Sequence, residues 1–262
     1  MSADLLTIIV PTLNEADNIQ PLLERIFEET SAALLLEVLF VDDGSTDETC
    51  ERILLFGKTH PVRLLRRERP AGGLAGAVLA GAGAAKSRWI LVMDGDLSHP
   101  PDRIADLVAP LLDGSQDMVI GSRYVPGGRT PGWPWWRRLM SRVACWLARP
   151  LTRLRDPLSG FFATDRARLL ECKSGAAGFK IALELIVNAP PGFRVKEIPI
   201  VFHDRERGES KVRLSVLVTY LFRLVVLLAR MTFRFGHSRA TALAEDHARA
   251  EDRDPADANS GR

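Results

Sequence analysis

Two acidic stretches decide how this chain of 262 residues folds: Val41-Asp42-Asp43-Gly44-Ser45-Thr46-Asp47 and Met93-Asp94-Gly95-Asp96-Leu97-Ser98-His99-Pro100-Pro101. Each follows a short apolar run, Val38–Val41 in the first case and Trp89–Met93 in the second. Such runs predict buried strands of a parallel sheet, and open α/β sheets bind their ligands beyond the carboxyl ends of the strands. We therefore expect both acidic stretches at the ligand-binding edge of one sheet.

The rest of the chain agrees with this sheet. Leu5–Val10, Val62–Leu65 and Met118–Ile120 predict further strands, and Val195–Phe202 predicts a last one. Helical patterns separate most of the early strands, as in the apolar series Ile19, Leu22, Leu23, Ile26 and Phe27. This alternation predicts right-handed βαβ crossovers. The expected fold class is α/β: a mainly parallel, Rossmann-like sheet flanked by helices, formed as one domain over residues 1–212.

Asp94 and Asp96 are candidate metal ligands. Residues i and i+2 of an extended segment face the same way, and two carboxylates ~5 Å apart repel by roughly 3 kcal/mol at an effective dielectric near 20. A divalent cation, Mg²⁺ or Mn²⁺, offsets this repulsion when it also binds the phosphates of a nucleotide. An isolated Asp-x-Asp is more often a pair of solvated turn acids. The strand context and the first acidic pair favour the metal site here.

Polar residues at the ends of the first two strands are candidates for nucleotide binding. Pro11, Thr12, Asn14 and Glu15 stand where the first strand meets its helix. Helix-start amides there can meet a nucleotide, although a simple capping turn fits the same residues. Asp42, Asp43 and Gly44 end the second strand, where carboxylates can accept hydrogen bonds from a base edge or a ribose hydroxyl.

The order and spacing of these motifs resemble the nucleotide-sugar-binding half of inverting family 2 glycosyltransferases with the GT-A fold. The further resemblance is to the dolichol-phosphate or polyprenol-phosphate mannosyltransferase branch of that family. It is carried by Gly121–Tyr124, Asp156–Phe161, Gly178–Ile181, Glu197–Ile200 and Arg205–Lys211, and it covers roughly Thr7 to Ser215. This resemblance implies that a hexose, most simply mannose from GDP-mannose, is transferred with inversion to a polyprenyl or dolichyl monophosphate.

The resemblance also assigns roles to residues. Asp94 and Asp96, with Ser98 ranked below them, would hold the metal; Asp94, Arg205 and Lys211 would contact the donor diphosphate. Arg123, Arg137 and Ser141 match the residues that bind the lipid phosphate, and Arg123 and Lys211 join the two aspartates as catalytic candidates. The residues themselves support the acceptor assignment, because Arg137 and Ser141 lie at i and i+4 of a predicted helix and arginine forks bind phosphate.

The proposed acceptor needs no general base. The second pKa of a phosphate monoester is near ~6, so at neutral pH the acceptor is mostly a dianion that can attack directly. The enzyme then supplies positioning and charge stabilisation. Two rivals remain. The first is an enzyme of the same family that uses UDP-glucose or UDP-N-acetylglucosamine as donor, or that transfers to a sugar hydroxyl with Asp156 or Glu184 as the base. The second is a non-catalytic nucleotide- or lipid-binding subunit.

The C-terminal residues predict contact with a membrane. Residues 213–236 are apolar but interrupted by Arg223, Arg230 and Arg234, which share one face of a helix. An arginine at the centre of a spanning helix costs roughly 2.5 to 3.5 kcal/mol, so we expect an amphipathic helix in the membrane interface. Residues 237–262 predict a disordered charged tail. Trp133, Trp135 and Trp136 predict a second interfacial contact.

These inferences predict a peripheral or monotopic protein at the cytoplasmic face of the cell membrane. Three cysteines without metal spacing suggest a reducing compartment. The expected partners are a nucleotide sugar, a polyprenyl monophosphate and the membrane surface, with a separate membrane subunit as a further candidate. We expect no nucleic-acid partner.

Overall fold

The computed structural model describes residues 5–171, 180–204, 224 and 226–228. The chain divides into two compact units, Met1–Val216 and Leu217–Arg262. Only four residues of the second unit are described, so the architecture below is that of the first. Arg205, Lys211, the predicted interfacial helix and the predicted tail fall outside the described residues, apart from those four.

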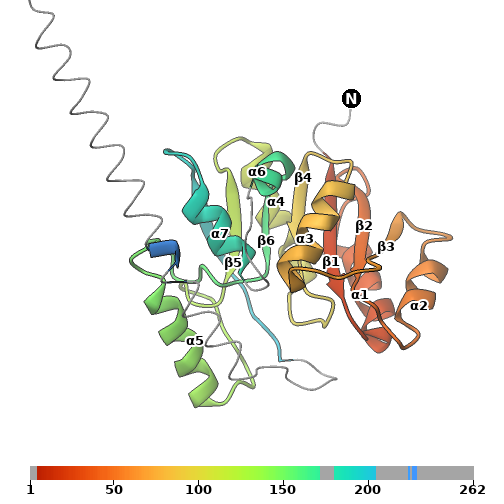
Figure 1. The fold of residues 1–262 in the computed structure, drawn as a ribbon, viewed down its shortest axis with the longest axis horizontal. Coiled ribbons are helices and arrows are strands. Elements are labelled where there is room, and N and C mark those ends of the chain that lie inside the picture. The colour runs from red at the N-terminus through yellow and green to blue at the C-terminus, as the bar shows by residue number, and fades with distance from the viewer. Residues whose placement is uncertain (1–4, 172–179, 205–223, 225, 229–262) are drawn as a thin grey trace, which may run out of the picture. The chain divides into compact units, whose positions relative to one another are not determined.

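A seven-stranded sheet with the order β3-β2-β1-β4-β6-β5-β7 forms the centre of the first unit (Figure 1). Neighbouring strands are parallel except β6, which is antiparallel to both β4 and β5. The mainly parallel α/β sheet predicted from the sequence is therefore confirmed. The strands are β1 (Leu6–Thr12), β2 (Leu35–Asp42), β3 (Val62–Arg66), β4 (Trp89–Val92), β5 (Met118–Ser122), β6 (Phe162–Asp165) and β7 (Val195–Pro199).

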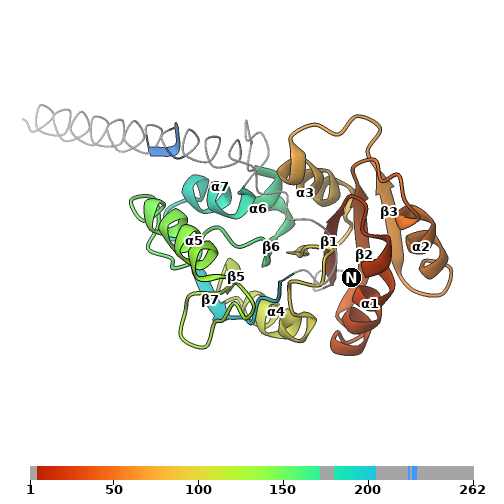
Figure 2. The ribbon, with the colours of Figure 1, turned by 90° about the horizontal axis from the view of Figure 1, so that it is seen from below.

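Helices cover both faces of the sheet, α1 and α4 on one side and α3, α6 and α7 on the other (Figure 2). Helix α2 packs against α1 and β3, beside the edge of the sheet. The helices are α1 (Ala16–Glu29), α2 (Thr49–Phe56), α3 (Gly73–Ala84), the 3₁₀ helix η1 (Pro101–Arg103), α4 (Ile104–Leu112), α5 (Trp135–Leu147), α6 (Arg166–Glu171) and α7 (Ile181–Asn188).

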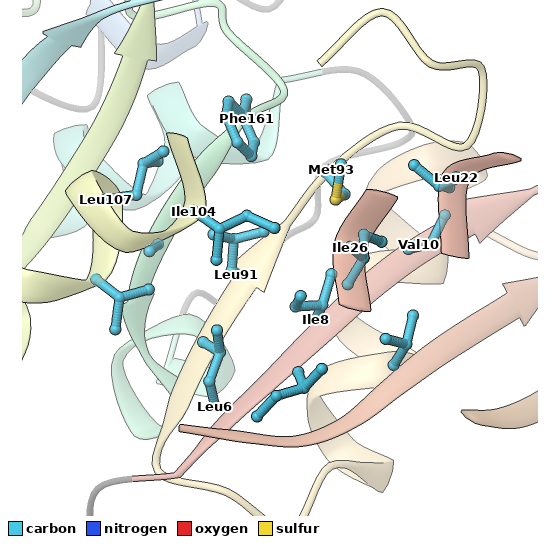
Figure 3. Packing of buried hydrophobic residues seen from close by; sticks show 14 of the residues in the cluster. Leu6, Ile8, Val10, Leu22, Ile26, Leu91, Met93, Ile104, Leu107 and Phe161 are labelled. Carbon is cyan, nitrogen blue, oxygen red and sulfur yellow. The ribbon is translucent and has the colours of Figure 1, made fainter. Parts of the chain in front are cut away.

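Two buried clusters hold these layers together, and β1 contributes to both. Its residues Leu6, Ile8 and Val10 pack towards α1 and α4, whereas Ile9 belongs to the cluster under α3 and α7. Figure 3 shows the first cluster from close by. This division follows from the period-2 alternation of a strand. Each fully buried Leu or Ile contributes roughly 1.5 to 3 kcal/mol through removal of apolar surface from water.

The strand register brings three sequence motifs to one edge of the sheet. Thr12 on β1 lies opposite Asp42 on β2, and Ile9 on β1 lies opposite Val92 on β4. Because these strands are parallel, the chain leaves each of them on the same side. The loops that follow β1, β2 and β4 therefore meet where the sequence predicted the ligand-binding edge.

Strand β6 was not predicted from the sequence. The residues Phe162, Ala163 and Thr164 follow a polar Gly loop, in a part of the chain where the earlier alternation of predicted strands and helices has ended. Their backbone is extended because β4 and β5 pair with it from both sides. Insertion of β6 separates β4 from β5, so the site at the end of β4 and the site at the end of β5 are held apart by one strand.

Candidate active site

The loop after β2 uses Asp42 to set its own shape. The Asp42 carboxylate is fully buried and accepts the backbone N–H groups of Gly44 at 3.0 Å and Ser45 at 3.1 Å. Gly44 has a φ of +94°, which a residue with a side chain rarely adopts. Asn14 joins this loop to the one after β1, because its side-chain oxygen accepts the N–H of Thr46 at 2.8 Å. Asp42 and Asn14 thus fix the backbone conformation of the loops after β1 and β2, which are called the donor loops below.

The other residues predicted to bind the donor nucleotide lie near Asp42 and Asn14. The Thr12 hydroxyl is buried and donates to the carbonyl of Val10 at 2.9 Å. Glu15 precedes α1, and its carboxylate accepts the side-chain amide of Asn18 at 2.6 Å. Pro11 is partly buried near the end of β1. The structure therefore gathers all the described donor candidates at one edge, but the Thr12 hydroxyl is already satisfied by the backbone.

Arg67 is a functional candidate that sequence analysis missed. Its guanidinium pairs through two nitrogens with both oxygens of Asp43, and both side chains are mostly buried. Arg67 also donates to the carbonyls of Ala71 at 2.9 Å and Gly73 at 3.2 Å. It therefore ties the loop before α3 to the acidic loop after β2. The only available signal was its position directly after a predicted strand.

The two aspartates after β4 differ in their surroundings. Asp96 is buried, and its Oδ1 accepts the backbone N–H of Ser98 at 3.1 Å and the Ser98 hydroxyl at 2.6 Å. The Asp94 side chain is 32% exposed, and its carboxylate accepts no hydrogen bond from the described residues. A Cβ placed on Gly160 would lie 3.6 Å from Asp94 Oδ1, so glycine leaves the approach to this carboxylate open.

The donor atoms of this loop fit a hard divalent cation. Asp94, Asp96 and Ser98 offer only oxygen, which Mg²⁺ and Mn²⁺ prefer. Within the described ranges no group of three His, Cys, Asp or Glu side chains is placed to hold a metal. Mg²⁺ commonly uses one or two carboxylates and completes its shell with water and substrate phosphates. The loop suits a metal that arrives with a nucleotide better than a permanent structural metal.

His99 orients the backbone of this loop. Its Nδ1 accepts the N–H of Asp94 at 2.9 Å, and its ring stacks on Phe161 at 5.0 Å. Burial lowers the pKa of His99 below its ordinary value, although Asp94 and Asp96 oppose this shift. The ring is therefore neutral at pH 7, and the accepted hydrogen bond assigns its proton to Nε2. This nitrogen lies 3.8 Å from Asp94 Oδ2.

A buried ion pair forms the acceptor half of the site. Arg123 follows β5 and donates through Nε at 2.8 Å and Nη2 at 2.7 Å to Asp156, which also accepts the Arg123 backbone N–H at 2.9 Å. Glu197 on β7 accepts the N–H groups of Arg155 and Asp156 at 2.8 and 2.7 Å. Burial would raise the pKa of Asp156, but Arg123 holds it below its ordinary value. A carboxylate held in this way is a poor general base.

Aromatic rings bring the three predicted acceptor residues together. The Arg123 guanidinium lies 5.6 Å from the ring centre of Trp133 and 5.3 Å from that of Tyr124. Arg137 lies 4.1 Å over the same Trp133 ring, and Tyr124 lies next to Ser141. Arg123, Arg137 and Ser141 thus surround two neighbouring aromatic side chains, at distances typical of cation–π contacts for the arginines.

Two observations change the predicted picture of this half. Trp133 is only 6% exposed, so the prediction that it contacts a membrane is wrong: its ring packs between the two arginines and Phe202. Arg137 donates to both carboxylate oxygens of Asp204, at 2.7 and 2.8 Å. A carboxylate of the protein itself therefore contacts the guanidinium that was predicted to bind a phosphate.

Lys180 is the second functional candidate that the prediction missed. Lys180 is partly buried, and its ammonium donates to the carbonyl of Leu158 at 3.0 Å. Burial lowers the pKa of this ammonium, Arg123 lowers it further, and Asp94 and Asp156 act in the opposite direction. The same segment carries Glu184, the other candidate base, which is buried on α7. The available signal was the Gly178–Ile181 motif, which was used for the resemblance without assigning a role to its lysine.

Aromatic packing links the two halves. The Phe202 ring lies 5.4 Å from that of His99 and 5.4 Å from that of Trp133. His99 contacts the Asp94 backbone, and Trp133 borders both acceptor arginines. A loop suited to a nucleotide and its metal therefore lies near a cluster of arginines and aromatic rings at the same edge of the sheet. This arrangement, on a mainly parallel α/β sheet, defines a nucleotide-dependent transferase with a GT-A-like fold.

The chain belongs to glycosyl transferase family 2, whose family model matches residues 7–175. It is 38% identical over 241 residues to a dolichol-phosphate mannosyltransferase of Saccharomyces cerevisiae, with 88% of each chain covered. It is 37% identical over 226 residues to a dolichol-phosphate mannosyltransferase of Pyrococcus furiosus, covering 85% of this chain but only 63% of that protein. A polyprenol monophosphomannose synthase of Mycolicibacterium smegmatis is 34% identical over 228 residues, 83% of this chain and 84% of that protein.

Solved structures agree on the fold. Glucosyl-3-phosphoglycerate synthase of Mycobacterium tuberculosis, in complex with Mn²⁺, UDP and phosphoglyceric acid, matches with a TM-score of 0.66 and 23% identity, covering 87% of this chain and 78% of that one. Its complex with Mg²⁺ and UDP matches with a TM-score of 0.65 at 23% identity, covering 87% of this chain and 79% of that one. At this level of identity the likeness establishes the GT-A fold.

Proposed function

We propose that this glycosyltransferase transfers mannose from GDP-mannose to a polyprenyl or dolichyl monophosphate, with inversion at the anomeric carbon. The observation that carries the proposal is the grouping of Arg123, Arg137 and Ser141 beside the nucleotide-binding loops. Two guanidinium groups and a hydroxyl suit a phosphate dianion. The names of the similar proteins, dolichol-phosphate mannosyltransferase and polyprenol monophosphomannose synthase, support the same choice.

The chemistry requires positioning more than proton transfer. An oxygen of the acceptor phosphate attacks the anomeric carbon from the side opposite the leaving group, and the bond from that carbon to the nucleoside diphosphate breaks. The acceptor is already ionised at neutral pH, so no base is needed. The immobilised Asp156 supports this choice over a sugar hydroxyl, because its oxygens are occupied by Arg123. Arg123, Arg137 and Lys180 supply the positive charge around the nucleophile.

The donor half would hold a divalent metal and the nucleotide. Asp94 and Asp96 are the proposed metal ligands, with Ser98 as a third oxygen that is already hydrogen-bonded to Asp96. When bound, the metal supplies a positive charge for the departing diphosphate. The proposed nucleotide site is formed or supported by residues at the ends of β1 and β2: Pro11, Thr12, Asn14, Glu15, Asp42, Asp43 and Gly44. Arg205 and Lys211 remain proposed diphosphate ligands from outside the described residues.

Membrane association is the second part of the proposal. Helix α5 exposes Trp135, Leu139 and Trp146, which are 71%, 54% and 64% accessible, and basic residues stand among them, including Arg138 and Arg142. An apolar helix face with basic residues suits the headgroup region of a membrane. No helix within the described ranges is long and apolar enough to cross a membrane. We propose that α5 and residues 213–236 bind the cytoplasmic membrane surface, with or without a separate membrane subunit.

A transfer assay tests the reaction. The purified full chain is incubated with a polyprenyl monophosphate in detergent micelles, Mg²⁺, and labelled GDP-mannose, UDP-glucose or UDP-N-acetylglucosamine in separate tubes. We expect label in the extracted lipid from GDP-mannose alone, an inverted anomeric centre by NMR, and loss of transfer in excess chelator. Label from a UDP-sugar alone would instead identify the rival donor. Absence of transfer from every donor would favour the non-catalytic subunit.

A vesicle assay tests the membrane surface. Leu139→Glu places a carboxylate on the exposed face of α5, whereas Leu55→Glu makes the same change at an exposed position on α2. Sedimentation with vesicles that contain anionic lipid should fall for Leu139→Glu and stay unchanged for the control. Equal sedimentation of both variants would exclude α5 as a membrane contact.

A further inference from the structure

Tyr124 carries a buried hydroxyl that the proposed reaction has not yet used. Its oxygen is inaccessible to solvent and, apart from the neighbouring Ser141 hydroxyl, has no hydrogen-bond partner among the described residues. Buried polar groups are nearly always hydrogen-bonded, because leaving one unsatisfied is costly. An unsatisfied hydroxyl in an otherwise well-packed site therefore indicates a partner that arrives with a ligand.

The position of Tyr124 identifies the chemistry of that ligand. Its ring lies 5.3 Å from the Arg123 guanidinium and 5.7 Å from that of Arg142, and its hydroxyl lies next to Ser141. The indole N–H of Trp133 is a second buried donor without a partner in the described part of the chain, and its ring is 5.6 Å from the same Arg123 guanidinium. Two unsatisfied donors beside two arginines suit an anion.

The two arginines already make hydrogen bonds within the protein, so a bound phosphate can also accept one from the Tyr124 hydroxyl. Arg123 is engaged by Asp156 through two of its nitrogens, and Arg137 is engaged by Asp204. A phosphate monoester presents three oxygens that each accept more than one hydrogen bond, so it can accept from a phenol hydroxyl in addition to the remaining N–H groups of these arginines. Burial raises the pKa of the Tyr124 phenol, so the hydroxyl keeps its proton at neutral pH and can donate it in a hydrogen bond.

We infer that the Tyr124 hydroxyl donates a hydrogen bond to the acceptor phosphate and positions it together with Ser141 and Arg123. The inference rests on the proposed function, because it names a further ligand for the same lipid phosphate. It assigns the role to one atom, the phenol oxygen. The aromatic ring keeps its packing between Arg123 and Arg142 whether or not that oxygen is present.

Tyr124→Phe tests the inference because it removes only this oxygen. The variant and the wild type are compared for the KM of the polyprenyl monophosphate, the KM of GDP-mannose and kcat. We expect the acceptor KM to rise about tenfold or more, as for a lost hydrogen bond to a charged group, with the donor KM unchanged. Ser115→Ala, which removes a hydroxyl at the amino-terminal end of β5, is the matched control and should leave all three values unchanged.

Three results would overturn the inference. An acceptor KM within twofold of the wild type would show that a buried water, and not the phosphate, satisfies the hydroxyl. Equal losses for donor and acceptor would make Tyr124 a general packing residue, as would a lowered unfolding temperature that accounts for the lost activity.

A binding experiment separates this inference from the proposed function. Calorimetric titration with farnesyl monophosphate is carried out on the wild type and on Tyr124→Phe. Weaker binding by the variant supports Tyr124 as a phosphate ligand even if the wild type transfers no sugar, in which case only the proposed reaction fails. Equal binding by both proteins rejects the role of Tyr124 while leaving the reaction to the transfer assay.

Discussion

The donor and acceptor halves of the site are held in different ways. In the donor half, Asp42 and Asp96 bind backbone N–H groups two or three residues further along the chain. In the acceptor half, Arg123 and Asp156 are 33 residues apart, and Arg137 and Asp204 are 67 apart. Donor loops therefore obtain part of their shape from neighbouring residues and part from the long-range contacts of Asn14 with Thr46 and of Arg67 with Asp43. The acceptor cluster depends on long-range pairs alone, so it exists only once the sheet has formed.

This difference separates the effects that substitutions should have. A donor-loop carboxylate such as Asp94 is partly exposed and contributes little to folding, so its loss should appear in catalysis. The acceptor pocket contains a charged pair removed from water, so loss of one partner should appear in stability as well. Four substitutions test this contrast, and their expected effects decrease in the order given below.

Asp156→Ala should have the largest effect. It leaves Arg123 buried without its carboxylate partner, and removal of one member of a buried ion pair lowers the free energy of unfolding by about 3 to 5 kcal/mol. The control is Asp106→Ala, which breaks the exposed pair with Arg103 and should cost about 0 to 1 kcal/mol. Chemical denaturation measures both. Similar costs for the two variants would remove the energetic distinction between the halves.

The same pair predicts a pH dependence. The pKa of folded Asp156 lies below its value in the unfolded chain, about 3.9. The ionised carboxylate therefore stabilises the fold fully above that pH, and this contribution is lost as the pH falls through the lower folded-state pKa. The stability gap between wild type and Asp156→Ala should be constant near neutrality and shrink in acid. A gap that grows in acid would contradict the assigned shift.

Asp94→Asn should have the next largest effect, on catalysis alone. The substitution keeps the shape of the side chain but removes the charge offered to the metal, and turnover should fall roughly 10²- to 10³-fold. The thermal unfolding midpoint should not change, because the Asp94 carboxylate accepts no hydrogen bond from the described residues. Turnover in saturating Mg²⁺ is the measurement. Wild-type turnover would remove Asp94 from the metal site.

Arg137→Ala should weaken use of the acceptor. Loss of a charge-assisted hydrogen bond costs about 1.5 to 3 kcal/mol, which raises the acceptor KM by roughly ten- to a hundredfold. The KM of the nucleotide sugar should stay the same. Arg153→Ala removes an exposed arginine outside the proposed phosphate and membrane contacts and serves as the control. A rise in the donor KM equal to that of the acceptor would place Arg137 in the nucleotide pocket.

Asp204→Asn should have the smallest effect, and in the opposite direction. Asp204 pairs with Arg137, so the acceptor phosphate must compete with it for the guanidinium. Exposed ion pairs contribute about 0.2 to 1 kcal/mol, so the variant should lower the acceptor KM by up to about fivefold. Asp117→Asn, which breaks the exposed pair with Arg194, is the control. A raised acceptor KM would instead make Asp204 part of the phosphate site.

The contrast between the halves also explains which parts of the site could be predicted. The acidic loops were recognisable because their residues are contiguous and follow strands whose carboxyl ends define the binding edge. The i, i+4 spacing placed Arg137 and Ser141 on one face of α5. In contrast, nothing local indicated that Arg67 would hold Asp43 or that Trp133 would be buried.

The class of fold and the residue types that meet at one edge of the sheet could be predicted from the chain alone, because strand period, loop chemistry and helix spacing are local properties. The folded structure was needed to see that β6 separates β4 from β5, that Asp156 pairs with Arg123, and that Lys180 lies partly buried near Asp94 and Asp156. These features depend on pairings between residues far apart in the chain, and their energies arise only when folding removes the partners from water.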